Sequence, residues 1–68
     1  MKQYMLRTKI NGVYHYYVKH IDIPKGMLTV TWSRYLGDAK LFGSSQEIDT
    51  LKAAEPVIKG RAVIYKED

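Results

Sequence analysis

Asn11-Gly12 lies between two runs of strand-forming residues, and this pair constrains the fold more than any other feature of the chain. A two-residue type I′ turn needs a positive φ at both central positions, which asparagine and glycine tolerate best. The pair therefore predicts a β-hairpin over residues 3–21. Because so short a turn also determines the register, Arg7 is expected opposite Tyr16.

The side chains of both hairpin strands point alternately to two faces. One face is apolar, and we expect it to pack on the core. Its residues are Leu6, Ile10, Val13 and Tyr17. The other face is basic and aromatic, and we expect it to meet solvent or a partner. Its residues are Arg7, Lys9, Tyr14 and Tyr16, with Met5 and Val18.

A second chain reversal is expected at residues 23–26, where Pro24 presets the φ of a turn. Residues 27–33 then alternate between apolar and polar side chains, as in a third strand. Symmetric pairing with the hairpin gives two apolar cross-strand pairs, Trp32 with Tyr17 and Leu28 with Ile21. The same alternation assigns Thr29 and Thr31 to the basic face. The apolar residues of three strands thus share one side, which favours a meander sheet.

A helix is expected over residues 44–55. Ser44 can accept a hydrogen bond from the first turn, and Glu47 three positions later completes a capping box. Pro56 ends the helix, because the residue before a proline is pushed out of helical dihedral angles. One stripe of the helix is apolar, namely Ile48, Leu51 and Ala54. A stripe this narrow suits a helix that lies on a sheet.

The remaining predicted elements are a short strand at 39–42 and a last strand at 60–66. The order is then β-β-β-β-α-β, and residues 1–68 make one small α+β domain. We expect a mainly antiparallel meander sheet with one helix packed on one face. A single helix leaves the other face of the sheet open to solvent or to a partner.

The charge of the chain is uneven, and cysteine is absent. Eleven lysines and arginines against seven aspartates and glutamates give +4, and residues 1–25 carry the excess. A chain without disulfides is expected in a reducing compartment. No apolar run approaches the ~20 residues of a transmembrane helix. We therefore expect a soluble cytoplasmic protein that binds no membrane and is attracted to anionic partners.

No pattern of residues indicates a reaction. His15 and His20 are five positions apart on a predicted strand, so they are expected to point to opposite faces and to share no metal ion. Spaced acidic pairs, phosphate-binding glycine patterns and nucleophile–base arrangements are not recognisable. We therefore expect no enzyme activity, no cofactor, no metal and no small-molecule substrate.

The stretch TWSRYLGDAKLFGSSQEIDTL, residues 31–51, resembles a pattern in small uncharacterised phage and prophage proteins of Gram-positive bacteria. In that family an aromatic-plus-loop segment is followed by an Ala-Lys-x-Phe strand and a serine-capped acidic helix. The Asn-Gly hairpin and the TVTWS strand are similar to staphylococcal phage members in particular. The resemblance implies the cytoplasm of a bacterial host and a small accessory protein, and it carries over no activity or site residues.

The candidate binding face is the basic and aromatic side of the sheet. It comprises Arg7, Lys9, Tyr14, Tyr16, Thr29 and Thr31. Tyrosine and arginine are enriched at protein–protein hot spots, so the leading hypothesis is binding to a host or phage protein, or self-association as a homodimer. The alternative is weak binding of nucleic acid, in which the cations meet phosphates and the rings stack on bases.

Overall fold

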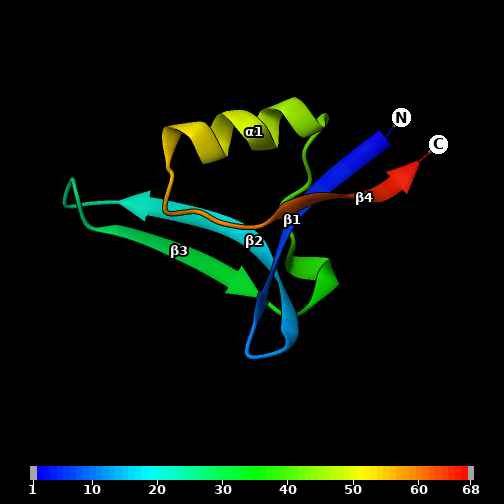
Figure 1. Cartoon of the computed structure of the whole chain (residues 1–68), viewed down its shortest axis with the longest axis horizontal. Coiled ribbons are helices and arrows are strands. Elements are labelled where there is room, and N and C mark those ends of the chain that lie inside the picture. Colours follow the sequence, from blue (N-terminus) through cyan, green and yellow to red (C-terminus); the bar gives the residue numbers. More distant parts are fainter. Residues whose placement is uncertain (1, 68) are drawn as a thin grey trace.

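The structure is a computed structural model that describes the backbone of residues 2–67 and the side chains of residues 2–66. Its elements in chain order are β1 (Lys2–Ile10), β2 (Val13–Asp22), β3 (Leu28–Ser33), the 3-10 helix η1 (Leu36–Asp38), α1 (Ser45–Ala54) and β4 (Arg61–Glu67) (Figure 1). The strands form one antiparallel sheet in the order β3-β2-β1-β4. Because α1 lies on one side of this sheet, the expected α+β fold is confirmed.

The first hairpin forms in the predicted register. Its turn at Asn11-Gly12 has φ angles of 51° and 81°, the positive values that a type I′ turn requires. Arg7 pairs with Tyr16 across β1 and β2. Tyr17 pairs with Trp32 across β2 and β3, again as expected. The turn chemistry and the apolar alternation therefore predicted three strands of the sheet correctly.

A β-bulge at Val18 shifts the pairing of β2 with β3 beyond this point. Leu28 lies opposite Asp22, and the prediction that it lies opposite Ile21 was wrong. The prediction assumed an uninterrupted strand, whereas a bulge sets one extra residue against its partner strand. Nothing in the residue pattern marks the position of that extra residue.

Segment 39–42 does not form the predicted strand. Phe42 makes an isolated bridge with Tyr4, in which the two N···O distances are 2.7 and 2.8 Å. Lys40 N donates to Tyr17 O at 2.9 Å, so the same segment is bonded to β2 as well. It lies where β1 and β2 part, beyond their last paired residues. Because the backbone of this segment hydrogen-bonds first to β2 and then to β1, it does not form a continuous ladder of hydrogen bonds with either strand.

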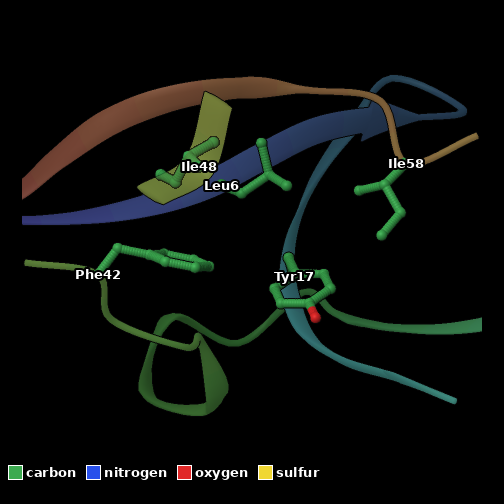
Figure 2. Close-up of a cluster of buried hydrophobic side chains, with 5 residues drawn as sticks. All are labelled: Leu6, Tyr17, Phe42, Ile48 and Ile58. Carbon is green, nitrogen blue, oxygen red and sulfur yellow. The ribbon is translucent and has the colours of Figure 1, made fainter. Parts of the chain in front are cut away.

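The core lies between α1 and the sheet, as Figure 2 shows. Its buried side chains come from two strands, from α1 and from the connections on either side of α1: Leu6, Tyr17, Phe42, Ile48 and Ile58. Leu6, Ile48 and Ile58 are fully buried. Ile58 lies after α1 and outside any periodic pattern, which is why the sequence analysis did not single it out.

α1 begins and ends where the sequence predicted. The hydroxyl of Ser44 accepts a hydrogen bond from the Glu47 amide at 3.4 Å, which caps the first turn. Within the predicted apolar stripe, Ile48 is buried and Leu51 is half-buried, but Ala54 is exposed because the helix ends there. A helix of the length and apolarity needed to span a bilayer is absent from residues 2–67.

Four strand residues differ from their expected burial. Ile21 was expected on the core side, but beyond the bulge it pairs with Thr29 on the other side and is exposed. Ile10 and Val13 belong to the predicted core side but are exposed, because they flank the hairpin turn away from the core cluster. Met5 belongs to the other side but is buried. It lies on β1, which is flanked by a strand on each side, and its partner on β4 is the apolar Val63.

Candidate binding surfaces

The side of the sheet opposite α1 is called the outer face below. It carries all six residues of the candidate binding face: Arg7, Lys9, Tyr14, Tyr16, Thr29 and Thr31. Their chain neighbours Leu6, Tyr17 and Trp32 belong to the core or pack against it, so alternation turns the six outward. The bulge in β2 adds Lys19, which pairs with Thr31.

Tyr14 is an exposed ring held by two cations of the outer face. Arg7 Cζ lies 3.9 Å from the ring centroid, and Lys9 Nζ lies 5.0 Å from it. Lys9 is the cross-strand partner of Tyr14, so the hairpin register brings them together. Such cation–π contacts orient the ring and hold both charges beside it. The cluster can offer an aromatic surface and two positive charges to the same ligand.

Arg61 is an outer-face residue that the sequence analysis missed. It begins β4 and pairs directly with Arg7. Directly opposed residues of an antiparallel pair share a face, and like charges in that position destabilise the sheet. Identifying this pair from the sequence would have required the register of β4 on β1, and an isolated last strand does not contain that information.

The outer face is positively charged. The strands place four cations on its middle, Arg7, Lys9, Lys19 and Arg61, and a fifth, Lys66, opposite Gln3 near the end of β4. Among the side chains of residues 2–66, the strands add no carboxylate to this face. Within the same residues none of the four cations in the middle makes an ion pair. At the β3 edge an acidic group is close by, because Ser33 Oγ donates to Asp38 Oδ2 at 2.7 Å. The uncompensated charge therefore lies toward β1 and β4.

The β2–β3 turn forms an apolar tip, which comprises Ile21, Ile23 and Met27. Ile23 is 81% exposed and Met27 is 66% exposed. Gly26 N donates to Asp22 Oδ1 at 2.9 Å, and Met27 N donates to Pro24 O at 3.0 Å, so the turn is internally bonded. Figure 1 shows it projecting past the end of α1. Large apolar side chains exposed around one turn are typical of a contact surface.

A cleft of about 610 Å³ lies on the α1 side of the sheet. Its lining includes Tyr17, His20, Lys40, Phe42, Glu47 and Leu51. Tyr17 Oη and His20 Nδ1 lie 2.6 Å apart in a hydrogen bond. Burial raises the pKa of the Tyr17 hydroxyl above its ordinary value of 10.0, so the phenol stays protonated at neutral pH. This cleft was not predicted, because it depends on the bulge in β2 and on the bonding of segment 39–42 to β1 and β2.

The prediction that the two histidines face opposite ways was wrong. The bulge at Val18 turns His20 to the side of Tyr17, and alternation from Tyr17 leaves His15 on that side too. His15 Nδ1 donates to Val13 O at 2.9 Å beside the hairpin turn. In the part of the chain that the structure describes, no three His, Cys, Asp or Glu side chains are grouped to hold a metal ion.

Comparison of the chain with protein-family models, with curated proteins and with solved structures finds no match. Two surfaces of the described residues have the geometry of a binding site. One is the outer face with the adjoining apolar tip, and the other is the cleft beside α1. The first is open and basic, and the second is concave and lies against the core.

Proposed function

We propose that this protein is a small non-enzymatic binding module that docks on an acidic protein surface through its outer face and apolar tip. The observation that carries the proposal is the pairing of Arg7 with Arg61 on an uncovered sheet to which the described strand side chains add no carboxylate. Like charges at directly opposed positions of an antiparallel pair repel each other, and the Arg7 guanidinium here lies over the Tyr14 ring. Carboxylates of a partner relieve that repulsion and accept bidentate hydrogen bonds from both guanidinium groups.

The apolar tip favours a protein partner over a nucleic acid. Ile23 and Met27 gain free energy only where a partner removes them from water, and a phosphate backbone offers no apolar pocket. Protein interfaces are enriched in methionine, tyrosine and arginine, and their energy is concentrated in a few buried anchors. The tip can supply such anchors, while the charges of the outer face steer the encounter.

The same charges argue against a homodimer formed by two outer faces. A two-fold axis through this face would bring the Arg7–Arg61 pairs of both copies toward each other. Four arginines in one interface without carboxylates repel, and like-charge contacts of this kind exclude wrong partners. The proposed partner is therefore a different protein. The resemblance of residues 31–51 to phage and prophage proteins supports a search for it in the cytoplasm of a Gram-positive host.

A second candidate function is weak binding of single-stranded nucleic acid on the outer face. The observation that favours it is the exposed Tyr14 ring with Arg7 and Lys9 beside it. Bases stack on such rings for about 1–3 kcal/mol each, and cations neutralise the phosphates. This mode predicts an affinity that falls steeply as salt rises.

The test is capture from a nuclease-treated lysate of a Gram-positive bacterium, followed by titration of each purified captured protein. We expect an acidic protein to bind the full chain, and Arg61→Glu and Ile23→Asp each to weaken binding at least about tenfold. Lys59→Glu and Val57→Asp are matched controls, because both residues are exposed in the connection between α1 and β4. They should leave the affinity unchanged.

Two results would decide against an acidic protein partner. If Arg61→Glu and Ile23→Asp bind every captured protein as tightly as the unaltered chain, the outer face is not the docking surface. If capture disappears with nuclease and the chain binds single-stranded oligothymidylate in low salt, the second candidate function is correct. In that case Arg7→Ala should reduce the slope of log affinity against log salt by about one.

A further inference from the structure

The cleft beside α1 is an open depression on the opposite side of the sheet from the proposed docking surface. Its volume of about 610 Å³ is within the roughly 300–1,000 Å³ typical of small-molecule sites. Tyr17 and Phe42 supply an aromatic floor, with their ring centroids 6.1 Å apart, and Leu51 supplies an apolar wall on α1. An apolar cavity with a few polar groups at its margin is the usual form of a ligand site.

Two basic side chains line this cleft, His20 from β2 and Lys40 from the segment before α1. Lys40 Nζ lies 5.7 Å from the centre of the Phe42 ring, so the ammonium group is held at the aromatic floor. His20 Nδ1 is hydrogen-bonded to Tyr17 Oη at 2.6 Å, which fixes the position of the imidazole ring in the lining. In the tautomer in which Tyr17 Oη donates to Nδ1, the other ring nitrogen, Nε2, carries the hydrogen and can donate to a ligand.

Glu47 is the one carboxylate in the lining, and it lies in the first turn of α1. It occupies the third position of α1, where a carboxylate is stabilised by the helix dipole. Its Oε2 lies against Gly43, only 3.1 Å from where a Cβ of that residue would be. The acid is thus folded back toward the start of the helix. The remaining polar side chains of the lining are Ser44, Gln46 and Thr50, each of which can donate or accept a hydrogen bond.

We propose that the cleft binds a small organic carboxylate whose apolar body lies on Phe42 and Leu51. Lys40 Nζ and His20 Nε2 donate to the carboxylate oxygens. This ligand class departs from the expectation that the chain has no small-molecule substrate, which was based on residue patterns and not on a cavity. The cleft and the outer face lie on opposite sides of the sheet, so the two proposals can fail separately.

The test is a titration of the ¹⁵N-labelled full chain with benzoate, followed by amide chemical shifts. We expect saturable shifts at Lys40, Thr50 and Leu51 with a dissociation constant of about 1 mM or tighter. Benzamide has the same ring without the charge and should bind roughly tenfold more weakly, the effect of one charge-assisted hydrogen bond. Lys40→Met should weaken benzoate binding by a similar factor and leave benzamide binding unchanged.

Matched variants separate this site from the rest of the molecule. Lys59→Met removes an exposed charge outside the lining and should leave benzoate binding unchanged, as should Arg61→Ala on the outer face. Lys40→Met keeps the backbone bond from Lys40 N to Tyr17 O, so a folded spectrum is expected. Absence of saturable shifts at the lining residues up to about 10 mM benzoate overturns the proposal, and so does equal affinity for benzoate and benzamide.

Discussion

α1 and its connections cover one side of the sheet and leave the other side open (Figure 1). This difference separates the two sides more than the types of residue that they carry. Tyr16 and Tyr17 are adjacent on β2, yet Tyr17 is buried in the core, whereas Tyr16 lies on the outer face. Leu6 and Arg7 divide in the same way on β1. Alternation places these side chains on two sides of the sheet, and only the side that packs against α1 and its connections is buried from solvent. The open side is left with aromatic and cationic groups that water or a partner must satisfy.

The covered side itself is covered only in part. Leu6 is 0% exposed, whereas Ile10, four residues further along the same side of β1, is 39% exposed. The hairpin therefore has a base that belongs to the core and an end that does not. An apolar side chain on the correct side of a strand is buried only where another element lies above it.

The largest expected effect on stability comes from truncating a side chain at the centre of the covered side. Leu6→Ala removes a fully buried side chain, so we expect the free energy of unfolding to fall by about 2–5 kcal/mol. Ile10→Ala on the same side of β1 should cost less than about 1 kcal/mol, because its side chain is already partly in water. Urea unfolding followed by circular dichroism measures both. If the two variants lost similar amounts of unfolding free energy, the burial of the hairpin's base beneath α1 would not explain its larger contribution to stability.

Local chemistry allowed much of the fold to be predicted. Asn11-Gly12 determined one register, the alternation at residues 27–33 identified a third strand, and Ser44 identified the start of α1. Each of these signals depends on residues close together in the chain. The bulge at Val18 left no such signal, and it displaced both the Leu28 pairing and the side of His20.

The candidate sites were predictable only where they depend on the hairpin. The cluster of Arg7, Lys9 and Tyr14 follows from one turn and one alternation. Arg61 joins it through the pairing of the last strand with the first, and the cleft depends on segment 39–42 entering between β1 and β2. Contacts between distant parts of the chain are set by tertiary packing, which a single sequence does not encode locally.

The next effect tests how closely β4 approaches the middle of the sheet. Gly60 has a φ of 134°, and a Cβ there would lie 2.7 Å from Arg7 O and 3.1 Å from Leu6 Cδ1. Gly60→Ala should therefore lower the free energy of unfolding by about 3 kcal/mol, through backbone strain and overpacking. Gly37→Ala is the matched control, because nothing lies within 4 Å of its added Cβ. A neutral Gly60→Ala, by thermal or urea unfolding, would contradict this close approach.

A smaller effect is expected from a change that destabilises α1 and leaves the residues of the sheet unaltered. Ser44→Ala removes the hydroxyl that accepts from the Glu47 amide, and loss of such a cap costs about 1 kcal/mol. Ser45→Ala, one residue later and exposed, should change stability by no more than a few tenths of a kcal/mol. Amide hydrogen exchange should show faster opening of α1 in the first variant. Equal exchange in the two variants would rule out a stabilising role for the cap.

The smallest expected effect probes the outer face of the free protein and has the opposite sign. Arg61→Ala removes the like charge opposite Arg7, so we expect the free energy of unfolding to rise by about 0.2–1 kcal/mol in low salt. In about 1 M salt the screening length falls to about 3 Å, and the gain should largely disappear. Lys59→Ala in the connection before β4 should show no comparable salt-dependent gain. If Arg61→Ala instead loses stability in low salt, the two arginines are not in conflict, and relief of their repulsion cannot contribute to binding an acidic partner.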